Sequence, residues 1–378
     1  MENYLTIVIF SGYNIRAVIA FLRTLKQNGI SFVIIAKDNK DQILKTEYKH
    51  NVIVIREEPD LDLKYIRKYF TIITHKLRSK KYLIAPTTEA LNRFLQKERE
   101  VLSQLGIIVP LCNSDIYNKI SDKKTFSDTC RKYGICTPRE YVSINDAYFP
   151  FVAKPKTYFA HDGTTPTPIL IFNEQHKQEF LNSYSEGDFY FQEYIDGRCV
   201  YLLYYFHRNG DIYKLSQENF VQQANGKSMI AAVTTNTHTS EVAVNFENLF
   251  VALGFYGLVM VEIKLSNNNS YMIEANPRFW GPSQLFVDAG KNLFEAFLHD
   301  YKLIESVPPF NKDTHLTRYF WFGGVCNSFR NSGKIIFHNL EEEKFLLDMH
   351  LWINAEIFKR ADTIEIFKEE LKCHQLID

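Results

Sequence analysis

The chain has 378 residues, 46% of them hydrophobic and 23% charged, which is typical of a globular protein with two or three domains of ~100–200 residues. Its 44 Lys and Arg residues balance 44 Asp and Glu residues, so net charge gives no reason to expect a nucleic acid or an anionic membrane as partner. No stretch approaches the ~20 uninterrupted apolar residues of a membrane span, and the N-terminus lacks the basic start and cleavage site of a signal peptide. We therefore expect a cytoplasmic protein.

The first third of the chain alternates short apolar runs with amphipathic segments. Strands are expected at 5–10, 31–36, 51–55 and 82–86, and helices from Ile15 to the Asn28-Gly29 stop and over 61–70. Such alternation predicts a parallel sheet with helices on both faces, here a Rossmann-like domain over 1–117. The turn "SGYN" after the first strand holds a single glycine, so it is not a dinucleotide fingerprint and gives no evidence for NAD.

The middle third has a different pattern, typical of antiparallel strands with helices. A helix ends at Gly134, strands cover "FVAKP" and "FQEYIDG", and two hairpins turn at Asn209-Gly210 and at Asn267–Asn269. Beyond Pro308 no motif is evident, although the tail "DTIEIFKEELKC" predicts a short amphipathic helix. The sequence thus predicts an α/β plus α+β protein with divisions at 1–117, 118–305 and 306–378.

The six cysteines are scattered, without CxxC or zinc-finger spacing, so we expect buried free thiols in a reducing compartment rather than disulfides or a metal site. These residues are Cys112, Cys130, Cys136, Cys199, Cys326 and Cys373.

The stretch "YMIEANPRFWG" places Glu274, Asn276 and Arg278 at alternate positions after an apolar run. Side chains two apart in a strand share one face. Two oxygen donors followed by a guanidinium suit a divalent cation and the phosphates that it carries. The alternative interpretation is a strand end whose polar residues enter solvent.

Four features occur in order along the chain: "SDKKTF…GICTP", "FVAKP", "FQEYIDG" and "VEIKL…YMIEANPR". Together they resemble the ATP-grasp superfamily, which includes biotin carboxylase, the halves of carbamoyl-phosphate synthetase, D-alanine–D-alanine ligase and related carboxylate–amine ligases. The resemblance covers about 118–300, and it implies a two-lobed ATP-grasp domain after the N-terminal layer.

The resemblance implies that Lys123 and Lys154 hold the nucleotide phosphates, although Lys124 could replace Lys123. It also implies that backbone groups near Gln192, Glu193 and Ile195 read the adenine ring.

A ribose-binding acid often follows the hinge glycine in this family, but Arg198 and Cys199 occupy that place here. Asp196 is the nearest substitute, so the ribose contact is an open question.

Glu262, Glu274 and Asn276 match the metal-binding set of the family. Glu262 and Glu274 would lie on opposite strands of a hairpin, where two carboxylates repel each other unless a cation lies between them. The resemblance implies Mg²⁺ with ATP, Mn²⁺ being an alternative, and it places Arg278 opposite the transferred phosphoryl group. Arg278 and Lys154 are thus the expected catalytic residues.

The chain departs from the family at the phosphate-covering loop. "KTYFAHDGTTPTP" contains only Gly163, so Thr164, Thr165 or His161 would have to approach the phosphates in place of a glycine cradle. The segment Gly226-Lys227-Ser228 is a candidate second cover, or simply a hairpin turn.

Three histidines, His161, His207 and His238, lack the spacing of a metal site, and we expect them to be solvated or in the core.

The function that the resemblance implies is that of an ATP-dependent carboxylate–amine ligase, which forms an amide through an acyl-phosphate and releases ADP and phosphate. The partners would be a small carboxylate and an amine, with amino acids among the candidates, and a homodimer is compatible with the sequence. A small-molecule kinase and a catalytically lapsed nucleotide-binding module are the alternatives, but the intact metal-binding trio argues against a lapsed module.

Overall fold

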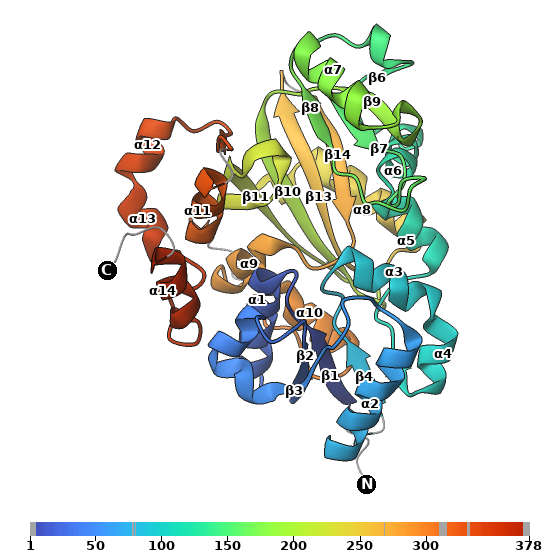
Figure 1. Cartoon of the computed structure of the whole chain (residues 1–378), viewed down its shortest axis with the longest axis vertical. Coiled ribbons are helices and arrows are strands. Elements are labelled where there is room, and N and C mark those ends of the chain that lie inside the picture. The colour runs from blue at the N-terminus through green and yellow to red at the C-terminus, as the bar shows by residue number, and fades with distance from the viewer. Residues whose placement is uncertain are drawn as a thin grey trace.

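The computed structural model describes residues 5–77, 79, 81–267, 269–309, 316–330 and 333–372. Three β-sheets build the molecule, a parallel one in the lower part of Figure 1 and two antiparallel ones above it. The presence of both parallel and antiparallel sheets confirms the expected mixture of α/β and α+β architecture. Within the described residues, no helix is both long and apolar enough to span a bilayer.

The N-terminal sheet has five parallel strands in the order β3-β2-β1-β4-β5. Its strands are β1 (Leu5–Phe10), β2 (Phe32–Ala36), β3 (Val52–Ile55), β4 (Lys81–Ile84) and β5 (Ile107–Ile108). The helices of this region are α1 (Ile15–Gln27), α2 (Leu63–Leu77), α3 (Glu89–Lys97) and α4 (Arg99–Gln104). Alternate residues of β1 enter two different cores, Ile7 and Ile9 with α1, and Val8 and Phe10 with α2 and α3. Burial on both faces explains why these strands are almost continuously apolar.

A small antiparallel sheet, in the order β6-β9-β7-β8, forms the lobe at the upper right of Figure 1. Its strands are β6 (Glu140–Tyr141), β7 (Phe151–Pro155), β8 (Ile169–Ile171) and β9 (Phe189–Glu193). The nearby helices are α5 (Ser114–Ser121), α6 (Lys123–Lys132) and α7 (Glu174–Ser183). The expected helix stop at Gly134 is confirmed, since this residue has a φ of 72° that side chains other than glycine rarely adopt.

The largest sheet has seven strands in the order β14-β13-β10-β11-β12-β15, with β16 paired to β11. Its strands are β10 (Arg198–Phe206), β11 (Ile212–Gln222), β12 (Met229–Thr235), β13 (Gly257–Ser266), β14 (Asn269–Asn276), β15 (Arg318–Phe320) and β16 (Ile336–Phe337). The two predicted hairpins are confirmed as β10–β11 and β13–β14. Helix α8 (Glu241–Ala252) covers one face, while α9 (Gln284–Asp288) and α10 (Leu293–Asp300) lie against the other.

The C-terminal part joins the large sheet, because β15 pairs with β12 and β16 with β11. Around these strands lie α11 (Phe322–Arg330), α12 (Glu342–Leu347), α13 (Met349–Asn354) and α14 (Ile364–Lys372). Figure 1 shows α12, α13 and α14 along the left side of the molecule. Helix α14 confirms the amphipathic helix predicted for the tail.

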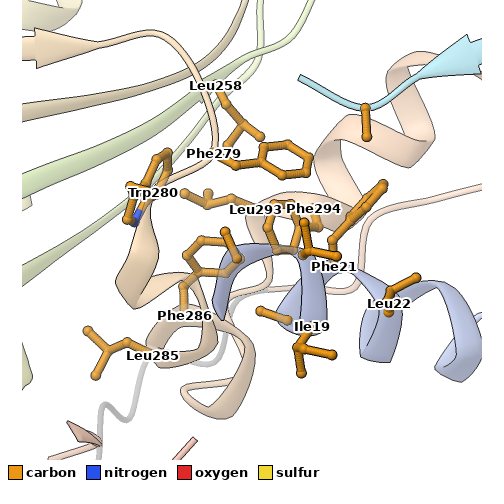
Figure 2. Close-up of a cluster of buried hydrophobic side chains, with 14 of the residues drawn as sticks. Ile19, Phe21, Leu22, Leu258, Phe279, Trp280, Leu285, Phe286, Leu293 and Phe294 are labelled. Carbon is orange, nitrogen blue, oxygen red and sulfur yellow. The ribbon is translucent and has the colours of Figure 1, made fainter. Parts of the chain in front are cut away.

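An aromatic core fixes the segment that follows β14 against α1 (Figure 2). The ring of Phe21 on α1 makes edge contacts with Phe279 and with Phe294 on α10, each at a centroid distance of 5.0 Å. Phe286 on α9 meets both Trp280 and Phe294. Because these rings are buried, the segment leaving β14 is held firmly beside the start of α1.

Cys112, Cys130, Cys199 and Cys326 are buried free thiols, as predicted, whereas Cys136 is free but exposed. Cys373 lies outside the described residues.

Candidate active site

A cleft of about 1170 Å³ opens where the parallel sheet faces the large antiparallel sheet. On the N-terminal side its lining begins at Phe10 and Ser11 after β1 and at Thr87 and Thr88 after β4. From β1 the chain continues to β2 and β3 on one side of the sheet, and it then crosses to β4 and β5 on the other side of β1. The strand order therefore reverses between β1 and β4. Open parallel sheets bind ligands in the crevice outside the carboxyl ends of strands at such a reversal.

The opposite side of the cleft carries the hairpin platform, which we define as Glu262 on β13 with Glu274, Asn276 and Arg278 on and after β14. Glu262 and Glu274 are directly opposite each other in the strand register, as the sequence predicted. The Asn276 amide nitrogen donates to Glu274 Oε1 at 2.7 Å, and Arg278 Nη2 donates to Asn276 Oδ1 at 3.1 Å. The shared face of the alternating residues is therefore confirmed. Glu274, Asn276 and Arg278 line the cleft, while Glu262 is buried and is not among the described lining residues.

Lys123, the first residue of α6, reaches the platform and forms an ion pair with Glu274. Burial lowers the pKa of Lys123 to about 8, although the nearby charge of Glu262 opposes that change. Lys124, the alternative residue, instead bonds Asp128 and Glu140, each at 2.8 Å, and is not part of the described cleft lining. The structure thus brings Lys123 rather than Lys124 to the platform.

Lys154 approaches the same platform from β7 through an irregularity of the hairpin. Glu262 pairs with Glu274 but Ile263 pairs with Met272, so Ile273 is an extra residue that bulges from the ladder. The Ile273 carbonyl accepts a hydrogen bond of 3.0 Å from Lys154 Nζ. Burial, together with the like charge of Lys123, lowers the pKa of Lys154 to about 7. An ammonium held at such cost is suited to receiving an anionic ligand.

The residues expected around adenine and ribose lie outside the described lining of this cleft. The Glu193 amide already donates to Arg139 O at 2.9 Å, within the sheet edge formed by β6 and β9. Gln192 is buried with its side-chain oxygen lacking a partner among the described residues, and Ile195 is also buried. Asp196 is exposed.

Arg198, which stands where a ribose-binding acid was expected, is neutralised by Glu218. Its Nε and Nη2 donate to the two carboxylate oxygens at 2.8 and 2.7 Å. This two-point pairing accounts for the basic residue at that place.

The glycine-poor segment after β7 lines the cleft with Tyr158, Phe159, Thr167 and Pro168. The residues proposed from the sequence to approach phosphate turn elsewhere: His161 pairs with Asp188, and Thr164 bonds Asp162 at 2.7 Å. Thr165 is exposed and is not part of the described lining. The cover of this cleft is thus aromatic rather than glycine-rich.

Gly226, Lys227 and Ser228 belong to the turn between β11 and β12, as the simpler interpretation predicted. All three nevertheless line the cleft, so this hairpin turn faces the candidate site.

The remaining histidines belong to packed regions, as expected. His238 is buried against Ser216 Oγ at 2.9 Å, and burial lowers its pKa to about 4. His207 lies 3.0 Å from His299 and close to Asp300. Among the described residues, no group of three or more His, Cys, Asp or Glu side chains is arranged to hold a metal ion.

Several cleft residues were not identified as site residues from the sequence, and most of them come from parts of the chain without a motif. These are Arg16, Arg56, Glu89, Arg93, Tyr201 and Trp280. Ser11 through Arg16 follow the first strand of the parallel sheet, so the rule that ligands bind at the carboxyl ends of such strands could have indicated them.

Comparison with solved structures gives matches along most of the chain. N5-carboxyaminoimidazole synthetase from Staphylococcus aureus, complexed with ADP, matches at a TM-score of 0.62 and 16% identity over 93% of this chain and 97% of that chain. Biotin carboxylase from Campylobacter jejuni matches at 0.59 and 14% identity, covering 80% and 72% of the two chains. L-amino acid ligase from Bacillus licheniformis matches at 0.56 and 12% identity, covering 82% and 78%. Neither protein-family models nor curated protein sequences give a match.

The fold, with one parallel and two antiparallel sheets among the described residues, is therefore shared with these solved structures. This is the ATP-grasp fold, and the resemblance inferred from the four sequence features is confirmed.

Proposed function

We propose that the protein is an ATP-dependent carboxylate–amine ligase that forms an amide through an acyl-phosphate. The observation that carries this proposal is the hairpin platform, where two facing carboxylates meet the buried Lys154, the partly buried Lys123 and Arg278 beside a large cleft. The substrate carboxylate would attack the γ-phosphorus of ATP and release ADP. An amine would then attack the acyl carbon and release phosphate.

The platform residues fit a divalent cation. Glu262 and Glu274 face each other across the hairpin, and without a cation their repulsion is relieved mainly by the Lys123 ammonium that contacts Glu274. Carboxylate and amide oxygens are the donors that Mg²⁺ prefers, so Glu262, Glu274 and Asn276 would hold it, with Mn²⁺ as an alternative. The bound cation would neutralise phosphate charge during transfer.

The two lysines and Arg278 would bind the phosphates. Lys123 and Lys154 lie at the same end of the platform and carry mobile point charges on flexible stems. Arg278 has a buried Nε without a partner among the described residues, so it retains a donor for the transferred phosphoryl group. When the phosphates bind, the Lys123 ammonium can move from Glu274 to a phosphate oxygen. The Glu274 carboxylate would then be available to bind the cation.

The adenine ring would lie on the far side of Lys154, against the backbone of Gln192, Glu193 and Ile195, with Asp196 near the ribose. Because the backbone N–H of Glu193 already bonds Arg139 O, the Glu193 carbonyl and the backbone of Ile195 would recognise the base. Aromatic residues of the cover, Tyr158 and Phe159, would exclude water from the reactive acyl-phosphate.

In this proposal residues 118–305 form the ATP-grasp catalytic unit, 1–117 a Rossmann-like layer that supplies one side of the substrate cleft, and 306–378 a C-terminal extension. The order β3-β2-β1-β4-β5 supports the Rossmann-like description. We propose a cytoplasmic enzyme acting on small molecules, amino acids among them, and a homodimer is compatible with this role.

The experiment is a screen of paired amino acids and small carboxylates with Mg-ATP, in which ADP, free phosphate and amide are measured together. A ligase releases ADP and phosphate in equal amounts with the amide. A stable phosphorylated substrate without free phosphate would instead identify a kinase, and nucleotide binding without any turnover would identify a lapsed module.

A further inference from the structure

Two arginines on the N-terminal side of the cleft, Arg16 and Arg56, are buried without an acidic partner. Their exposed fractions are 9% and 6%, and neither forms an ion pair with any described residue. Other arginines near the core are neutralised, as Arg23 is by Asp362 at 2.8 Å and Arg93 by Glu89 at 2.7 Å. A buried charge is costly unless it is paired, so an anion from outside the chain is the expected partner of Arg16 and Arg56.

Arg16 is held in one orientation by contacts from several segments. Its Nη1 donates to Met229 O and to the Tyr319 hydroxyl, both at 3.0 Å, and its guanidinium lies 3.9 Å from the centre of the Trp321 ring. On the other side, a Cβ on Gly281 would come within 2.7 Å of the guanidinium carbon. No acceptor for Nε or Nη2 is present among the described residues, so a pre-oriented fork of donors is left for a ligand.

The acids nearest to Arg16 among the described residues interact with its charge electrostatically but do not contact it in an ion pair. Glu356 and Glu370 lie beyond Trp321 and Phe322, and neither forms an ion pair with Arg16 among the described contacts. Burial raises the pKa of Glu356 to about 8 and that of Glu370 to about 7, so both are partly protonated at neutral pH. Glu89, which lines the cleft, is engaged by Arg93 and by the Tyr117 hydroxyl at 2.8 Å.

The first turn of α1 adds backbone donors to the same place. Asn14, at the N-cap, makes no capping bond, because its side chain donates instead to Thr87 O and Phe279 O at 3.0 and 3.1 Å. Ser11 and Asn14 line the cleft. The N-terminus of this helix of 13 residues therefore presents uncapped N–H groups at the cleft that Arg16 and Arg56 also line.

The platform and these arginines are connected by the short segment after β14. Arg278 lies on the platform, and Gly281 contacts Arg16, while the buried rings of Phe279 and Trp280 fix the segment between them (Figure 2). Arg278 and Arg16 therefore line one and the same cleft.

We propose that Arg16, Arg56 and the first turn of α1 form an arginine wall that binds a second anionic group, a carboxylate or a phosphate, of the substrate that reacts at the hairpin platform. This inference rests on the proposed function and narrows its substrate to acids that carry one further negative group. A guanidinium fork binds either oxyanion through two parallel hydrogen bonds.

The test is calorimetric titration of malonate and of inorganic phosphate into protein already saturated with Mg-ADP. We expect saturable binding of at least one probe, weakened at least tenfold by Arg16→Met and by Arg56→Met. Tighter binding of malonate would identify a carboxylate, and tighter binding of phosphate a phosphoryl group. Arg99→Met is the matched control, since Arg99 also lacks an acidic partner but donates to Leu111 O and Cys112 O outside the described cleft lining.

Arg16→Lys keeps the charge but loses the planar fork, so we expect it to weaken binding of the probe anion by about threefold to tenfold. It also provides a second variant should Arg16→Met fail to fold. The proposal is overturned if neither probe binds saturably, or if parental binding survives both methionine variants. The heat of Mg-ADP binding is recorded first in every sample. If that heat is absent, the proposed function fails, and the same probe titration without nucleotide still tests the arginine wall.

Discussion

The two sides of the cleft balance charge in opposite ways. On the hairpin platform, Lys123, Glu274, Asn276 and Arg278 contact one another in a continuous chain of bonds. On the arginine wall, Arg16 and Arg56 have no acidic partner among the described residues. A side that neutralises itself can exchange its internal partners for a cation and phosphates. A side with uncompensated cations needs an anion from the ligand.

The two sides also differ in how well a sequence motif predicts them. The platform is contained in one hairpin and its neighbouring lysines, so its residues occur at regular spacing. The arginine wall is assembled from β1–α1, the segment after β3 and the supporting C-terminal residues Tyr319 and Trp321. Its chemistry depends on contacts between residues more than 300 positions apart in sequence.

The largest effect is expected on the platform side, from Glu274→Gln. The substitution keeps the size of the side chain but removes one of the two facing carboxylates, so a divalent cation is held less tightly and neutralises less phosphate charge. We expect turnover of Mg-ATP to fall on the order of 100-fold or more, measured as phosphate release in the presence of the substrate pair. Unchanged turnover would show that Glu274 is not part of the catalytic platform.

Lys154→Met, also on the platform side, should change Mg-ADP binding and the free energy of unfolding in opposite directions: binding weakens while the fold becomes more stable. Burial lowers the pKa of Lys154 to about 7, so the folded state binds the proton less tightly than the unfolded state does. Removal of this group should therefore raise the free energy of unfolding by about 1–3 kcal/mol at neutral pH, while Mg-ADP binding weakens at least tenfold. Chemical denaturation and calorimetry measure the two quantities.

The control is Lys156→Met, two residues further on, where the lysine is exposed. It should change neither quantity appreciably. A Lys154→Met variant that is less stable and binds the nucleotide normally would contradict a phosphate-binding role.

Gly281→Ala tests how the arginine wall is supported. Its new methyl group would come within 2.7 Å of the Arg16 guanidinium, so the side chain has to leave its place between Gly281 and Trp321. We expect a destabilisation of about 1–3 kcal/mol and a loss of the anion binding described above. Gly187→Ala is the matched control, since the nearest atom to its Cβ is Ser185 Oγ at 3.6 Å. Retention of full anion binding in Gly281→Ala would mean that Arg16 does not need this position.

The smallest expected effect is a pH dependence of the free energy of unfolding, caused by Glu370 near the arginine wall. Burial raises the pKa of Glu370 to about 7, above its unfolded value of about 4.5, so its favourable contribution is complete below pH 4.5 and is lost as the pH rises through 7. Glu370→Gln should gain about 1–3 kcal/mol of stability relative to the parent between pH 5 and pH 8. Denaturation at these two pH values measures this gain, with Glu365→Gln at an exposed position as control. A difference that does not vary with pH would refute the titration of Glu370.

Much of the fold could be predicted because local patterns decide it. The apolar, β-branched runs "LTIVIF" and "FVIIA" are typical of buried strands, and the hairpin turns at Asn209-Gly210 and around Asn267 carry turn residues. The second turn also placed Glu262 and Glu274 on paired strands, but their direct pairing depends on the bulge at Ile273.

The remaining features depend on tertiary contacts that the sequence does not encode locally. Strands β15 and β16 are very short and are positioned by pairing with β12 and β11, so the sequence beyond Pro308 shows no motif for them. The bulge at Ile273 that receives Lys154 is a property of two strands together. Lys123 and Lys124 could be distinguished only when the position of Glu140 opposite Lys124 was known.

Calorimetric titration of ADP, with and without Mg²⁺, into the parent and into Glu274→Gln tests the central claim most directly. The hairpin platform predicts that the parent binds ADP at least tenfold more tightly with Mg²⁺ than without it, because the cation links the facing carboxylates to the phosphates. In Glu274→Gln this advantage of Mg²⁺ should largely disappear. An absence of nucleotide-dependent heat at millimolar ADP would contradict a metal–phosphate role for the platform, as would a Glu274→Gln variant whose response to Mg²⁺ equals that of the parent.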